Sequence, residues 1–92
     1  MNRGDAYEVL STRLNELRSC GYDALLRRVG RPADSETVQI NDEPVVIDVE
    51  VEWADPKHEK LRVSGTASGP STWMMERLNE SFVIRPGTPA TG

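Results

Sequence analysis

The sequence is poor in the residues that build covalent cross-links and membrane spans. It contains one cysteine, Cys20, so the chain cannot form an internal disulfide, and a metal site built from several cysteines is excluded. No run of apolar residues approaches the ~20 needed to cross a bilayer, and the first residues hold no apolar stretch of signal-peptide length. We therefore expect a cytoplasmic protein that makes no membrane contact.

Charged residues are unevenly distributed along the 92 residues. The net charge is −4, yet residues 34–59 hold nine acidic residues against Lys57 alone, whereas the two flanking segments are each mildly basic. A protein that binds nucleic acid needs a basic face to neutralise phosphates. The acidic middle third therefore argues against nucleic-acid binding. The hydrophobic content of 37% is ordinary for a globular chain and suffices for one small domain.

The segment before Gly21 has the pattern of an amphipathic helix. Asp5 suits the N-cap position, and Glu8 follows three residues later, as in a capping box. Gly21 stands where a left-handed residue commonly ends a helix. Apolar residues recur at three- and four-residue steps and share one helical face, namely Tyr7, Leu10, Leu14 and Leu17. We expect a helix from about Ala6 to Ser19.

The next segment, residues 22–30, fits two conformations. Asp23 suits the cap of a short helix that Gly30 would end, but so few residues do not fix a period, and an extended segment also fits. The helix is the favoured interpretation. Three arginines would lie on or near its exposed side: Arg27, Arg28 and Arg31.

Three later segments change to a period of two, which is typical of strands. Apolar and polar residues alternate in residues 37–40, 45–53 and 61–68, and polar loops containing Asn, Asp or Pro separate them. Short polar connections favour an antiparallel meander with one buried face and one wet face. Residues 70–79 then begin with proline and hold several apolar side chains, which predicts a C-terminal helix.

The predicted fold is an α+β two-layer sandwich. In it, the N- and C-terminal helices cover one face of a three-stranded antiparallel meander. Residues 1–86 form this single domain, in which Trp53 and Trp73 supply the largest core side chains and residues 81–86 form a short strand or an extended tail. The small, turn-forming residues 87–92 are expected to be disordered.

The longest alternating segment places three carboxylates on its wet side. With the valines of that segment buried, Asp48, Glu50 and Glu52 point to solvent about 7 Å apart. Lys60 and Arg62 of the following strand are positioned to lie opposite them, so a solvated, partly compensated sheet face is one interpretation. Docking of a basic protein partner is another, because clustered negative charge accelerates association with cations. Calcium or magnesium binding is a third, although the carboxylates lie along a rigid strand and not in a loop that wraps an ion.

Two other features are candidates for chemistry. The segment Gly65–Thr72 contains glycines and hydroxyls just before the predicted helix, where backbone N–H groups can bind a small anion. Its candidate anion-binding residues are Gly69, Ser71 and Thr72. Cys20 and the single histidine, His58, are candidates for a nucleophile–base pair, but nothing in the sequence supports such a pair.

The sequence alone favours a non-catalytic protein–protein interaction or accessory domain with an exposed acidic sheet face. Its partner would be a basic protein or a second copy of the chain. Trp73 and Met75 are candidate apolar contacts, because consecutive helical residues lie about 100° apart and cannot all point inward. The alternative function is binding of a small anion or a metal through the Gly65–Thr72 turn or the acidic strand. No enzymatic activity and no cofactor are expected.

Overall fold

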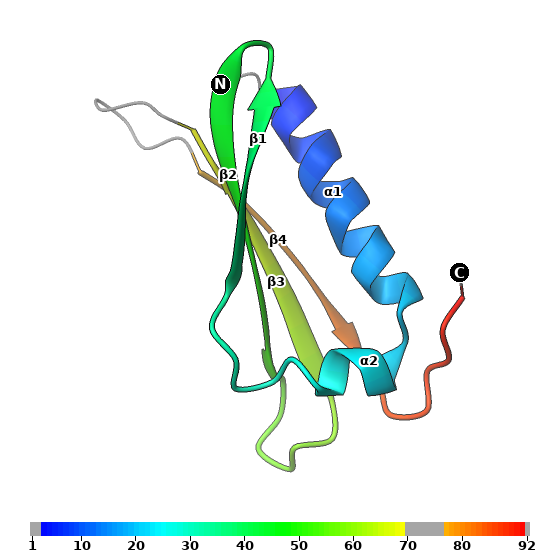
Figure 1. The fold of residues 1–92 in the computed structure, drawn as a ribbon. Helices are drawn as coiled ribbons and strands as arrows, with labels where there is room; N and C mark the ends of the chain where they lie inside the picture. Colours follow the sequence, from blue (N-terminus) through cyan, green and yellow to red (C-terminus); the bar gives the residue numbers. More distant parts are fainter. Residues whose placement is uncertain (1–2, 70–76, 92) are drawn as a thin grey trace.

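The computed structural model describes residues 3–69 and 77–91, which form a small α+β fold. A four-stranded antiparallel sheet with its strands in chain order forms one layer, and two helices form the other (Figure 1). The elements are α1 (Arg3–Ser19), α2 (Tyr22–Leu26), β1 (Asp34–Ile40), β2 (Glu43–Trp53), β3 (Leu61–Ser68) and β4 (Arg77–Ile84). Within the described residues, no helix has both the length and the apolar character needed to cross a membrane.

A two-residue turn joins β1 to β2 and sets their register. Asn41 and Asp42 both have positive φ, 51° and 65°, as in the type I′ turn that matches the twist of a hairpin. Asparagine and aspartate tolerate this backbone region better than other side chains do. Ile40 therefore lies opposite Glu43, and the ladder continues to the pair Asp34 and Val49.

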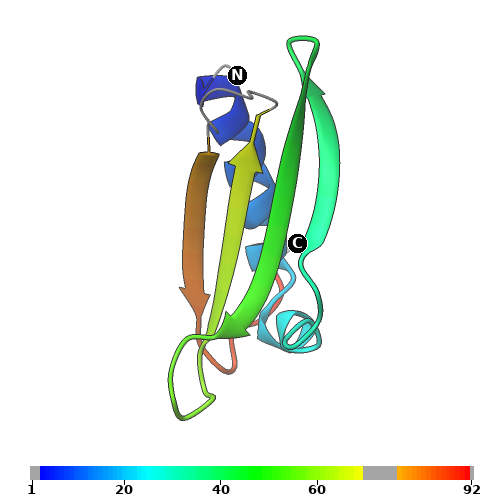
Figure 2. The same cartoon turned by 90° about the vertical axis from the view of Figure 1, so that its left-hand side faces the viewer.

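The helices lie on one face of the sheet. α1 contacts β3 and β4, and the short α2 contacts β3 (Figures 1 and 2). Close approach of α1 depends on Gly65 in β3, because a Cβ there would lie 2.7 Å from Leu10 Cδ1 and 3.1 Å from Leu14 Cδ2. A glycine in a strand marks such a close contact.

Alternating strand residues and one helix face form the core. In β2 the buried residues alternate with more exposed ones over Val45, Ile47, Val49 and Val51. The largest fully buried side chains are Leu10, Leu25, Ile47, Leu61, Val45 and Val63. The prediction that Trp53 is a principal core residue is wrong in part: Trp53 is half-buried and packs at the edge of the core. Trp73 lies outside the described residues.

A fourth strand replaces part of the predicted C-terminal helix. Residues 70–76 lie outside the described part of the chain, but Arg77–Asn79 belong to β4, which pairs with β3 along its whole length. Phe82 and Ile84 are buried on the helix side, whereas Val83 between them is 51% exposed. The apolar residues of this segment also fit a helical spacing. The strand forms because alternate residues are buried and the backbone can hydrogen-bond to β3. The sheet therefore has four strands, and both described helices precede it in the chain.

The favoured interpretation of residues 22–30 is confirmed in part: Tyr22–Leu26 form the helix α2, but residues 27–30 form a turn. Gly21 occupies the N-cap of α2, and Asp23 lies in its first turn. The first helix begins at Arg3, earlier than the predicted Ala6, so Asp5 lies in its first turn and not at its N-cap.

Residues 87–91 contact the junction between the two helices. The Tyr22 N–H donates to the Thr88 carbonyl at 3.0 Å, and the Thr91 N–H donates to the Ser19 carbonyl at 2.9 Å. Gly21 has φ +84°, and a Cβ there would lie 2.7 Å from the Ala90 nitrogen. These hydrogen bonds place Thr88 and Thr91 beside the two helices. The disorder expected of residues 87–92 stays a prediction.

Candidate functional site

The sheet face opposite the helices is covered by no described element, and we call it the open face (Figure 2). Short polar side chains occupy much of its centre, where Thr66 lies opposite both Asp48 and Asn79 in the ladders. The Thr66 hydroxyl donates to Asn79 Oδ1 at 3.0 Å. The outward residues that define the open face are Ser35, Thr37 and Gln39 of β1, Pro44, Val46, Asp48, Glu50 and Glu52 of β2, Arg62, Ser64, Thr66 and Ser68 of β3, and Arg77, Asn79, Ser81 and Val83 of β4.

The three predicted carboxylates, here called the acidic stripe (Asp48, Glu50 and Glu52), lie together on this face. Asp48 is half-buried and accepts a hydrogen bond from the Ser35 hydroxyl. Glu52 lies 3.7 Å from Arg62, and both side chains are about half exposed, so this pair contributes only about 0–1 kcal/mol. Glu50 is exposed and has no hydrogen-bond or ion-pair partner in the described part of the chain. Glu52 is therefore the one carboxylate of the stripe that forms an ion pair within the described residues.

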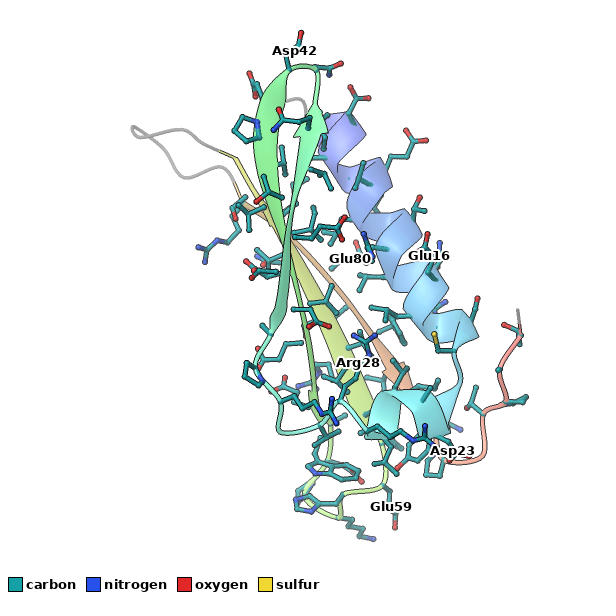
Figure 3. All side chains as sticks on the ribbon, in the orientation of Figure 1. Glu16, Asp23, Arg28, Asp42, Glu59 and Glu80 are labelled. Carbon is teal, nitrogen blue, oxygen red and sulfur yellow. The ribbon has the colours of Figure 1, made fainter. Side chains whose placement is uncertain are left out.

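Within the described part of the chain, the arginines after α2 form no ion pair with the stripe. Arg28 forms an ion pair with Asp34 at 2.6 Å, on the β1 side of the sheet (Figure 3). Arg27 and Arg31 form no ion pair or side-chain hydrogen bond within the described residues. Cations on the open face itself are Arg62 and Arg77, on β3 and β4. On the open face, negative charge is thus concentrated on β2, and the two arginines lie on β3 and β4.

The other predicted contact residues lie mostly outside the described residues. Gly69 follows β3 and is half-buried, and Gly65 is within β3 beneath α1. The remaining anion-binding and apolar contact candidates have no described structure: Ser71, Thr72, Trp73 and Met75. Their proposed roles stay predictions.

Cys20 and His58 do not contact each other. The exposed Cys20 thiol donates a hydrogen bond to the Glu16 carbonyl at 3.4 Å. The His58 ring instead stacks on Trp53, with ring centroids 4.9 Å apart and planes at 12°. No cluster of three or more His, Cys, Asp or Glu suited to a metal ion occurs among the described residues.

The loop between β2 and β3 is organised by Asp55. Its Oδ1 accepts the backbone N–H groups of Glu59 and Lys60, each at 2.9 Å. The hydrogen bond from the Lys60 backbone lowers the pKa of Asp55 below its ordinary value of 3.8, because it stabilises the charged carboxylate. The Tyr22 hydroxyl donates to the Glu59 carbonyl at 2.8 Å and attaches this loop to α2.

A cavity that the sequence does not reveal lies between the segment after α2 and the edge of β2. We call it the arginine cavity; its volume is about 330 Å³, and the charged residues among those that line it are Arg27, Arg28, Arg31, Asp34 and Glu50. The three closely spaced arginines were the available signal, but only the fold shows that they border one space. A second cavity of about 380 Å³, toward α1, shares Arg28 and Asp34 with it.

Comparison with known protein families, curated proteins and solved structures finds no match to this chain.

Proposed function

We propose that the chain is a non-catalytic protein–protein interaction or accessory domain whose open face docks a basic segment of a partner. The observation that carries the proposal is the acidic stripe on an uncovered sheet face, unpaired by the arginines that follow α2. A cytoplasmic location, expected from the sequence, belongs to the same proposal.

The geometry of the stripe suits an extended basic segment. Alternate residues of a strand lie about 7 Å apart on one face, and alternate side chains of an extended partner have the same spacing. A partner with Lys or Arg at every second position would therefore place one cation near each carboxylate. Short neighbouring side chains such as Ser64, Thr66 and Ser81 let the backbone of the partner approach the sheet.

Electrostatic complementarity of this kind acts mainly on specificity and association rate. The stripe is solvent-exposed over most of its length, so added salt should screen it. Binding should consequently weaken as ionic strength rises.

The test is a pull-down from a lysate of the source organism at low and moderate salt. The baits are the wild type, the triple variant Asp48→Asn/Glu50→Gln/Glu52→Gln, and a control with the same change in charge, Glu8→Gln/Glu16→Gln/Glu59→Gln. The control acids are exposed and lie on α1 and in the β2–β3 loop. Circular dichroism first establishes that all three baits are folded.

We expect a basic partner that both the wild type and the control variant retain and the stripe variant loses. Retention by all three baits, or equal loss from both variants, would show that the stripe does not dock the partner. Capture of the chain by itself, with the same dependence on the stripe, would identify the partner as a second copy.

A further inference from the structure

We infer that the arginine cavity binds a small phosphate monoester. The cavity lies at the edge of β2 beside the turn after α2, and it shares Glu50 with the open face. The inference concerns a small ligand of the arginines and does not depend on the function proposed for the open face. Its volume of about 330 Å³ lies within the range of small-molecule sites.

The backbone after α2 holds the arginines in a compact turn. Arg27 caps the C-terminus of α2, the Arg28 N–H donates to the Leu25 carbonyl at 2.9 Å, and the Arg31 N–H donates to the Arg28 carbonyl at 3.2 Å. Gly30, with φ +80°, allows the chain to reverse within this turn. The three guanidinium groups are therefore carried by hydrogen-bonded backbone along one wall of the cavity.

Two of the three guanidinium groups are available to a ligand. Asp34 holds Arg28 at 2.6 Å, whereas Arg27 and Arg31 have no acidic partner in the described part of the chain. Arginine presents several N–H donors in a planar fork and binds phosphate oxygens in pairs. Two unpaired arginines fit a phosphate monoester, which carries close to two negative charges at neutral pH.

Apolar residues in the lining are the reason to expect an ester in place of the free ion. β1 ends its pairing with β2 at Asp34 and Val49, which leaves the edge of β2 beyond Val49 next to the arginine turn. Ala24, Pro32, Val49 and Val51 also line the cavity, and they supply apolar surface for the organic group.

Among the described residues, two acids line the cavity: Asp34 is paired with Arg28, and Glu50 is the one that opposes an anion here. It lines the cavity at the β2 edge and also belongs to the acidic stripe. Removal of its charge should therefore strengthen binding of a phosphate ester while it weakens docking of a basic partner on the open face. These opposite effects separate the two proposals.

The experiment is an NMR titration of the ¹⁵N-labelled full chain with phenyl phosphate. Phenyl sulfate, which has a similar shape and a single negative charge, and inorganic phosphate are titrated in parallel. The variants are Arg27→Gln/Arg31→Gln, Glu50→Gln, and a control that removes two exposed arginines elsewhere, Arg62→Gln/Arg85→Gln. The dispersion of each spectrum verifies the fold before the titration.

We expect saturable shifts in amides of residues 24–34 and 49–51, with phenyl phosphate binding more tightly than either comparison ligand. The Arg27/Arg31 variant should weaken binding at least about tenfold, a loss of about 1.4 kcal/mol, while the control leaves it within about twofold. Glu50→Gln should tighten it. Absence of saturable binding, equal affinity for phenyl sulfate, or equal loss in the control variant would overturn the inference.

Discussion

Gly65 of β3 lies directly beneath Leu10 of α1, where a Cβ at Gly65 would come within 2.7 Å of Leu10 Cδ1. Leu10 is fully buried and Leu14 is nearly so, and the same Cβ would lie 3.1 Å from Leu14 Cδ2, so both side chains would have to shift. Gly65→Ala should therefore lower the free energy of unfolding by about 1–3 kcal/mol, as overpacked cores do. Urea unfolding measures the change. The control is Ser81→Ala, a small exposed residue on the open face, and an equal effect of both variants would show that α1 does not rest on Gly65.

Two glycines with nearly equal positive φ differ in what an added side chain would contact. Gly21 and Gly30 have φ of +84° and +80°, but a Cβ meets the Ala90 nitrogen at 2.7 Å only at Gly21, while Gly30 has nothing within 4 Å. Alanine at either position should cost about 1–3 kcal/mol because of the positive φ, and the ψ of 168° places Gly21 in a region that is essentially restricted to glycine. Gly21→Ala should cost about 1 kcal/mol more, because it also displaces residues 88–91. Thermal or urea unfolding of the two variants tests this difference, and equal losses would mean that the tail contact adds no stability.

Asp55 makes the stability of the β2–β3 loop depend on pH. Its pKa in the folded protein is lowered, chiefly by the backbone hydrogen bond from Lys60, so the unfolded chain binds a proton more readily. The stabilisation is therefore present above the unfolded value near 3.8 and is lost as the pH falls through the lower folded value. Asp55→Asn should be less stable than the wild type at neutral pH, and the difference should disappear in acid. NMR titration of the Asp55 carboxyl carbon gives the midpoint directly, and a midpoint at or above 3.8 would contradict the role of these hydrogen bonds.

The stacking of His58 on Trp53 allows the same loop to be followed by tryptophan fluorescence. The chain has two tryptophans, so Trp73→Phe leaves Trp53 as the one emitter. In that background His58→Ala should move the emission maximum to longer wavelength, because removal of the imidazole exposes one face of a half-buried indole to water. Lys57→Ala, the neighbouring exposed residue, serves as the control. An unchanged emission in the His58 variant would show that the stack does not persist in solution.

The sequence predicts those elements whose periods are long and unbroken. α1, β2 and β3 follow from the three- and four-residue spacing of Leu10, Leu14 and Leu17 and from the alternation around Val49 and Val63. The acidic stripe is predicted by the same alternation, because burial of every second β2 residue on the helix side places the carboxylates between them on the opposite face.

The rest depends on pairing between distant segments. The apolar residues near Leu78 fit a helical face as well as a strand, and only hydrogen bonding to β3 selects the strand. The arginine cavity likewise depends on the length of β1, which begins at Asp34 and pairs with β2 only as far as Val49. The unpaired edge of β2 beyond Val49 then lies beside the turn that carries Arg27 and Arg31. Neither the pairing of β4 with β3 nor the position of the cavity produces a periodic pattern of residues in a single sequence.

The central claim, that the open face binds basic segments, is tested most directly with a defined peptide. An NMR titration of the ¹⁵N-labelled chain would use an acetylated and amidated peptide of alternating lysine and threonine. The account predicts that the largest amide shifts fall in residues 46–52 of β2 and 62–68 of β3, diminish with added salt, and vanish in Asp48→Asn/Glu50→Gln/Glu52→Gln. Largest shifts on the helices or near Asp42 at the β1–β2 turn (Figure 3), or undiminished shifts in the triple variant, would contradict it.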